Sequence, residues 1–199
     1  MDTETRARRL HNDDGAVLVE AVFVLPVLIF IVMAIFEFGL LFAAQSTTQA
    51  ATKEGVRFAS ANYAVAGSNQ AAADAVASEV AKDLNLATTG FDTPLKLFVY
   101  KADPNGDPIG GYNSCTQSCY RYTWNGSGWT IEAGSPAWPD PSACVVLDSA
   151  DPNAGINTLD SIGTYVELRH SYVTGAFGSS QLIKEHTVSR LEPLPSGQC

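Results

Sequence analysis

The stretch Gly15-Ala16-Val17-Leu18-Val19-Glu20 begins an apolar segment that runs to Ala44. After Ala16, Glu20 and Glu37 are the ionisable residues of this segment, and no charge lies between Ala21 and Phe36. About 20 apolar residues are enough to cross the hydrocarbon core of a bilayer. As a helix, residues 16–44 would measure roughly 43 Å, which allows for tilt and for a short extension outside the membrane. The sequence therefore predicts one membrane-spanning helix over residues 16–44.

The basic residues on either side of this segment predict its orientation. Arg6, Arg8 and Arg9 precede it, and the next basic residue is Lys53. The positive-inside rule then places the N-terminus in the cytoplasm. We therefore expect a cytoplasmic leader at 1–15, a membrane helix at 16–44 and an extracytoplasmic domain at 45–199.

A cleaved secretory signal is the alternative for the same segment. Ala44-Gln45-Ser46 has the small-x-small pattern that such cleavage requires. The apolar region of a secretory signal is normally about 7–15 residues long, however, and this one is nearly twice that length. The length favours a retained membrane helix.

Glu20 needs a compensating interaction, because a carboxylate inside a membrane segment costs about 2.5–3.5 kcal/mol on insertion scales. Cleavage after Gly15 would give Ala16 a positive α-amino group, which could pair with Glu20 of the same chain or of a neighbouring subunit. The alternative is a glutamate near the start of the helix that reaches the interface and is stabilised by the helix dipole. Glu37 is expected to be solvated near the outer interface, and the alternative is a second intersubunit pairing site.

Pro26 lies inside the predicted membrane helix. Proline lacks an amide hydrogen and its ring clashes with the preceding turn, so we expect a flexible or kinked point there. Such a point would help the helix to leave the bilayer and pack in an assembly. The alternative is a proline that the membrane helix simply tolerates, because neighbouring groups satisfy the freed carbonyl.

Four cysteines fall in the exported part, Cys115, Cys119, Cys144 and Cys199. An oxidising compartment would let them form two disulfides, with three possible connectivities. We favour Cys115–Cys119, which are close in sequence, and Cys144–Cys199, which then have only each other. A zinc site is disfavoured because no second ligand pair has spacing comparable to that of Cys115 and Cys119.

The pattern beyond Ala44 predicts an α+β domain. Small residues continue the first helix, and a second amphipathic helix follows over residues 70–86, with Val76, Val80 and Leu84 on one face. Strand patterns then occur at 95–100, at 120–124 and 129–132 as a hairpin, and at 144–147, 164–169 and 182–191. Helices followed by a run of strands indicate an antiparallel sheet packed against the helices.

Composition and motifs argue against several classes of function. Residues 45–199 carry 15 acidic and 9 basic residues, whereas a nucleic-acid surface needs clustered Lys and Arg. His170 and His186 fall in separate strand patterns, and no triad or phosphate-binding glycine loop accompanies them. The Asp103-Pro104-Asn105-Gly106-Asp107 stretch fits a turn better than a calcium loop. We expect no enzyme activity, no metal, no cofactor and no nucleic-acid partner.

Three stretches resemble a known family. Residues 15–28, GAVLVEAVFVLPVL, resemble the N-terminal signature of TadE-like proteins, which are minor pilin-like (pseudopilin) components of Tad/Flp pilus systems. Residues 51–59, ATKEGVRFA, are similar to the small-residue helix of that family with its E-G-x-R-aromatic-A ending. Residues 190–193, RLEP, resemble a tail seen in such proteins.

The resemblance implies cleavage between Gly15 and Ala16 by a prepilin peptidase, so that Glu20 becomes the fifth residue of the mature chain. It also implies partners among other Tad pilins and pseudopilins, the inner-membrane assembly platform and membrane lipid, and a place in a surface pilus used for cell adhesion. Ala21 after Glu20 and Ala16 as first mature residue suit a minor component better than an abundant fibre subunit. One alternative is an uncleaved, membrane-anchored binding or sensory domain. Another is a membrane-anchored hydrolase, for which the sequence offers no candidate catalytic residues.

Overall fold

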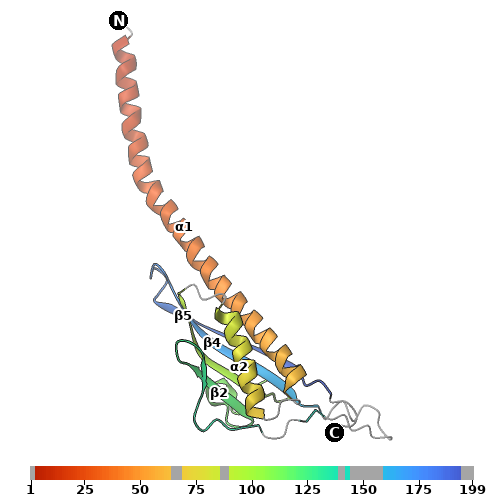
Figure 1. Ribbon diagram of the computed structural model, residues 1–199. Coiled ribbons are helices and arrows are strands. Elements are labelled where there is room, and N and C mark those ends of the chain that lie inside the picture. The colour runs from red at the N-terminus through yellow and green to blue at the C-terminus, as the bar shows by residue number, and fades with distance from the viewer. Residues whose placement is uncertain (1–2, 64–68, 86–89, 139–141, 144–158, 194–199) are drawn as a thin grey trace. The chain divides into compact units, whose positions relative to one another are not determined.

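The computed structural model describes residues 3–63, 69–85, 90–138, 142–143 and 159–193 (Figure 1). It divides into an N-terminal unit, Met1–Leu41, and a C-terminal unit, Phe42–Cys199. The elements are α1 (Thr3–Asn62), α2 (Asn69–Asn85), β1 (Asp92–Lys101), α3 (Gly111–Ser114), β2 (Cys119–Trp124), β3 (Trp129–Ile131), β4 (Ser161–Ser171) and β5 (Ser180–Arg190). A long apolar N-terminal helix, a second helix and an antiparallel sheet confirm the expected α+β class.

The first helix is longer than the predicted membrane segment at both ends. It begins at Thr3, so most of the expected leader is helical as well, and it continues through Ala44 to Asn62. The continuation beyond Ala44 was expected from the small residues that follow. The part from Phe42 onward belongs to the C-terminal unit.

The sheet has five strands in the order β3-β2-β1-β4-β5, and each neighbouring pair is antiparallel. The β1 strand begins at Asp92, earlier than the sequence pattern indicated, and its register with β4 shifts between Pro94 and Lys96. Such an irregularity accommodates a proline, which cannot donate to the ladder. The strand expected at 144–147 lies outside the described residues.

The C-terminal part of α1 and the whole of α2 pack on one face of this sheet (Figure 1). The expected apolar face of α2 is buried, since Val76, Val80 and Leu84 are almost fully inaccessible. On α1, the Thr52 carbonyl accepts a hydrogen bond from the Thr164 hydroxyl of β4 at 2.7 Å. The expected packing of an antiparallel sheet against the helices is therefore confirmed.

The helices and the sheet approach one another closely at Gly55 of α1. A Cβ atom at this position would lie 2.6 Å from Cγ2 of Val80 and 3.5 Å from Cγ2 of Thr164. The absence of a side chain is what allows α1 to approach α2 and β4 together. This contact gives a physical reason for the glycine in the Glu54-Gly55-Val56-Arg57 stretch.

A second apolar cluster covers the opposite face of the sheet. It contains Phe98, Tyr100, Ala102, Cys115, Cys119 and Tyr165, with Tyr112 and Val188 packed against it. The chain between β1 and β2, including α3, supplies the cover. Burial, with a hydrogen bond to the Asp107 carboxylate, raises the pKa of Tyr112 to about 12. These side chains form an ordinary aromatic core.

Candidate functional site

The candidate functional segment of this protein is the apolar stretch of α1 in the N-terminal unit. Its helix is long and apolar enough to cross a membrane, with a mean hydropathy of 2.9 over its most apolar window, none of which is buried. The exposed large side chains there are Val17, Leu18, Val19, Val22, Phe23, Val24, Leu25, Val27, Leu28, Ile29, Phe30, Ile31, Val32, Met33, Ile35 and Phe36. A soluble monomer rarely exposes so continuous an apolar surface. This surface indicates a membrane anchor.

The residues expected to carry processing lie at the start of this surface. Gly15 is exposed within α1, and a Cβ atom at its position would have no neighbour within 4 Å. Among the described residues, therefore, none packs against the Cβ position of Gly15, in contrast to Gly55. Glu20 is also exposed, and it follows Ala16 by four residues, so the two positions share one face of the helix.

The backbone of α1 continues through Pro26, so the structure shows no end of the helix at this residue. Proline still removes one amide hydrogen bond from the ladder, and a loosened turn there stays a prediction. We expected Glu37 to be exposed to solvent. This prediction is wrong, because the residue is 1% exposed.

Further along α1, the Ala51–Ala59 stretch divides into a packed side and an exposed side. Ala51, Gly55 and Ala59 are buried toward the sheet and α2. Glu54 and Arg57 are exposed and form a 3.7 Å ion pair one turn apart. Exposed pairs of this kind contribute little stability, about 0.3–0.5 kcal/mol. The motif therefore combines a tightly packed glycine with charges that remain available to solvent or a partner.

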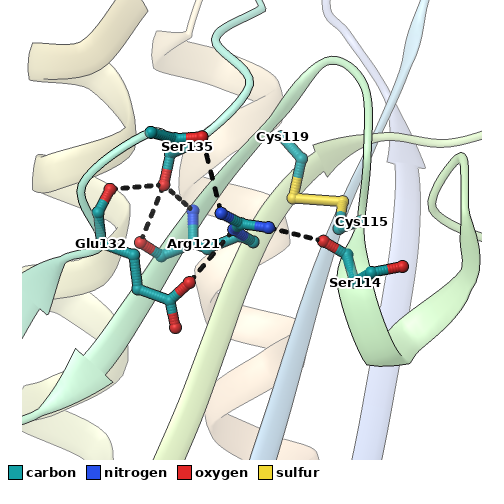
Figure 2. Close-up of polar contacts among 7 residues, drawn as sticks. Ser114, Cys115, Cys119, Arg121, Glu132 and Ser135 are labelled. Carbon is teal, nitrogen blue, oxygen red and sulfur yellow. Dashed lines mark hydrogen bonds and ion pairs between the residues drawn. A yellow bond between two sulfur atoms is a disulfide. The ribbon is translucent and has the colours of Figure 1, made fainter.

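The cysteine pair lies on the far face of the sheet (Figure 2). A disulfide joins Cys115 to Cys119, whose Cα atoms are 6.1 Å apart. Arg121 of β2 holds the same loop, because its guanidinium donates to the Ser114 carbonyl at 2.9 Å and pairs with Glu132 at 3.1 Å. This arrangement fixes the loop covering the second cluster. Cys144 and Cys199 lie outside the described residues, so their pairing stays a prediction.

The two histidines considered for catalysis do not meet. His170 is buried in β4 and its Nδ1 lies 2.7 Å from an Asp92 carboxylate oxygen. His186 of β5 packs against the Tyr112 ring, and its register partner is Tyr165 rather than His170. On β5, the register partner of His170 is Gln181, which lies five residues from His186. The two histidines are therefore about 16 Å apart along the strand direction. This geometry offers no shared site.

The Asp103–Asp107 stretch and the β2–β3 connection are both turns in the structure. Asp103 caps its own loop, because the backbone amides of Asp107 and Asn105 donate to its carboxylate and hold its pKa below the usual range. Asn125 likewise accepts from the amide of Gly128 in the β2–β3 turn. Among the described residues, no three His, Cys, Asp or Glu side chains are grouped so that they could hold a metal ion.

The hairpin aromatics pack across the strands as expected. Trp124 and Trp129 are register partners with ring centroids 5.2 Å apart in an edge-to-face arrangement. Beside them, a hollow lies between β2, β3 and α2, where the Tyr122 hydroxyl donates to Asp74 at 2.8 Å. Burial, together with this hydrogen bond, raises the pKa of Tyr122, so the phenol stays neutral.

Comparison with known proteins adds one finding. No curated protein and no solved structure matches the chain. Residues 15–57 match the family model described as TadE-like protein. The matched range runs from Gly15 through the exposed apolar surface to the packed Gly55 and its neighbour Arg57. Over this segment the chain is TadE-like, as its resemblance to that family led us to expect.

Proposed function

We propose that this protein is a minor pilin-like component of Tad pilus biogenesis that is processed by a prepilin peptidase and assembles through its apolar N-terminal helix. The observation that carries the proposal is the TadE-like match over residues 15–57, which coincides with the exposed apolar surface of α1. The helix anchors the protein in the inner membrane with its N-terminus in the cytoplasm. The C-terminal unit then lies outside the cytoplasm, where the Cys115–Cys119 disulfide is stable.

Gly15 and Ala16 are the proposed processing site. A protease binds its substrate as an extended strand, and a residue without Cβ lets the backbone approach the enzyme closely. The exposed position of Gly15, with open space around it, leaves this segment accessible once its helical turn is unwound. Cleavage leaves the Ala16 amine within one helical turn of Glu20 on the mature chain.

Assembly depends on this new amine in the proposal. A positive amine beside Glu20, from the same chain or a neighbouring subunit, offsets the cost of a carboxylate within lipid. A buried pair of this kind fixes the register between packed helices more than it adds stability. The partners are other Tad pilins or pseudopilins and the inner-membrane assembly platform. The protein itself has a structural role and carries out no chemistry.

Gly15→Leu is expected to block processing. The added side chain prevents close approach at the cut, and we expect cleavage to fall at least tenfold, which corresponds to about 1.4 kcal/mol or more. The measurement is the ratio of full-length to shortened chain, by intact mass, when the protein is co-expressed with its prepilin peptidase.

Gly39→Leu is the matched control for this variant. It makes the same change within α1, at another glycine with no neighbour within 4 Å of the Cβ position. Normal cleavage of Gly39→Leu together with an uncut Gly15→Leu chain would support the site. Equal processing of both variants would refute Gly15 as the residue before the cut. An uncut native chain would instead favour a membrane-anchored binding or sensory domain.

A further inference from the structure

The hairpin between β4 and β5 carries an uncharged, apolar tip. Residues 171–183, SYVTGAFGSSQLI, contain no Asp, Glu, Lys or Arg, although such residues make up 17% of the chain. Val173, Phe177 and Leu182 are 52%, 38% and 43% exposed. Phe91, 36% exposed, adjoins them, since its carbonyl accepts a hydrogen bond from the Ser171 amide. These four apolar residues are called the tip patch below.

The contacts between α1 and β5 locate the tip patch within the C-terminal unit. Going along α1, Gln45 contacts Glu185 at 3.4 Å and Thr52 contacts Thr187 at 3.1 Å. The Ser60 carbonyl then accepts from the Glu192 amide at 2.9 Å. The helix and the strand therefore run in the same direction. The tip patch lies at the end of the unit where the chain enters from the apolar segment.

The spacing along both elements shows how far the tip extends. Leu182 lies three strand residues before Glu185, about 10 Å nearer this end. Phe42 lies three helix residues before Gln45, about 4.5 Å nearer the same end. Leu182 thus extends about 5 Å past Phe42, the first residue of the unit, and the turn of the hairpin lies beyond it.

We propose that the tip patch inserts into the outer interface of the same bilayer that α1 crosses, giving the C-terminal unit a second contact with lipid. The inference rests on the membrane anchoring in the proposed function and goes beyond it. The tip lies at the end of the C-terminal unit where the chain enters from the membrane helix, and a headgroup region several Å thick borders the hydrocarbon core on each side. Aromatic side chains, here Phe177 with Tyr172 next to the patch, suit this region. Residues 171–183 bring no charge into it, and the exposed Arg169, the register partner of Leu182, lies at the edge of the patch.

The other end of the sheet carries charged residues. There Lys101 pairs with Asp160 at 2.6 Å, and Arg190 is exposed. The exposed apolar side chains of the tip patch are therefore not a general property of the surface of this unit, which favours a lipid contact at the tip. A contact at the tip end, together with the covalent link through α1, would hold the unit in one orientation on the membrane before assembly. Extraction of the helix into a pilus would then have to release the tip patch from lipid.

Quenching of tryptophan by brominated lipid tests this contact in the full chain. Phe177→Trp places a reporter in the tip patch, and Ala61→Trp places one at an exposed site near the other end of α1 in the same unit. Both are reconstituted at about one protein per vesicle, with acyl chains brominated near the headgroup. The signal from Trp124, Trp129 and Trp138 is subtracted by using the native chain. We expect the tip reporter to be quenched at least threefold more than the Ala61 reporter, and to be protected from aqueous iodide.

Equal quenching of the two reporters by brominated lipid would overturn the inference, as would full access of iodide to the tip. Val173→Trp repeats the test at the most exposed residue of the patch, so that a folding defect in one variant cannot decide the result. Resistance to alkaline extraction is measured in the same vesicles. An anchored chain whose tip is unquenched refutes the lipid contact and leaves the proposed function standing, whereas a chain that is not anchored refutes both.

Discussion

Glu20→Ala is expected to be cut normally after Gly15 and yet to lower the number of pili per cell at least tenfold. The cut depends on the backbone around Gly15, whereas assembly depends on the carboxylate that meets the new amine of Ala16. Without the carboxylate, that amine would enter the apolar helix packing unpaired, and leaving one member of a buried pair alone costs about 3–5 kcal/mol. Electron microscopy gives the pilus count, and intact mass gives the processing of the same cultures.

The matched control is Glu54→Ala. Glu54 also lies on α1 within the TadE-like range, and its exposed ion pair with Arg57 has little energetic weight. We expect this variant to be cut and piliated like the native protein. Normal piliation by Glu20→Ala would remove charge pairing from the account and would leave Glu20 as a residue that reaches the cytoplasmic interface.

Gly55→Leu is expected to destabilise the C-terminal unit by about 1 kcal/mol or more. A Cβ here already lies 2.6 Å from Val80, so a leucine must push α1 away from α2 and β4. Overpacking of this kind costs about 1–3 kcal/mol, and sometimes more, while the better helix propensity of leucine returns about 1 kcal/mol at most. Thermal unfolding of the detergent-solubilised chain, followed by tryptophan fluorescence, measures the change. Trp138, stacked on Tyr63 just after the end of α1, reports on this region.

Gly39→Leu gives the same change in helix propensity without the clash, because nothing lies within 4 Å of its Cβ position. A lower unfolding temperature for Gly55→Leu, with an unchanged one for Gly39→Leu, would assign the effect to packing. If the two variants unfolded at the same temperature, the tight α1–α2–β4 contact would not be a feature of the folded protein in solution.

Local patterns were enough to predict most of the fold. The charge-free run after Glu20, the Val76, Val80 and Leu84 spacing and the Trp124–Trp129 hairpin each depend on residues close in sequence, and each has the expected structure. The beginning of β1 was missed because Pro94 disfavours a strand, and only pairing with β4 around a register shift explains how it is accommodated.

Features that depend on distant residues could not be predicted. Gly55 was recognisable in the sequence as part of a family-like motif. Its neighbours Val80 and Thr164 could not be identified, because they lie 25 and 109 positions further along the chain. The tip patch similarly requires the β4–β5 register and the parallel course of α1 and β5. A charge-free run at 171–183 was visible in the sequence and is the signal that could have pointed to it.

The most direct test of the account is the N-terminal residue of the membrane-extracted protein, determined by mass spectrometry with and without the cognate prepilin peptidase. The account predicts a chain that starts at Ala16 when the peptidase is present and retains the 1–15 leader when it is absent. A leader retained in both cases, or a start near Thr47 independent of the peptidase, would contradict it.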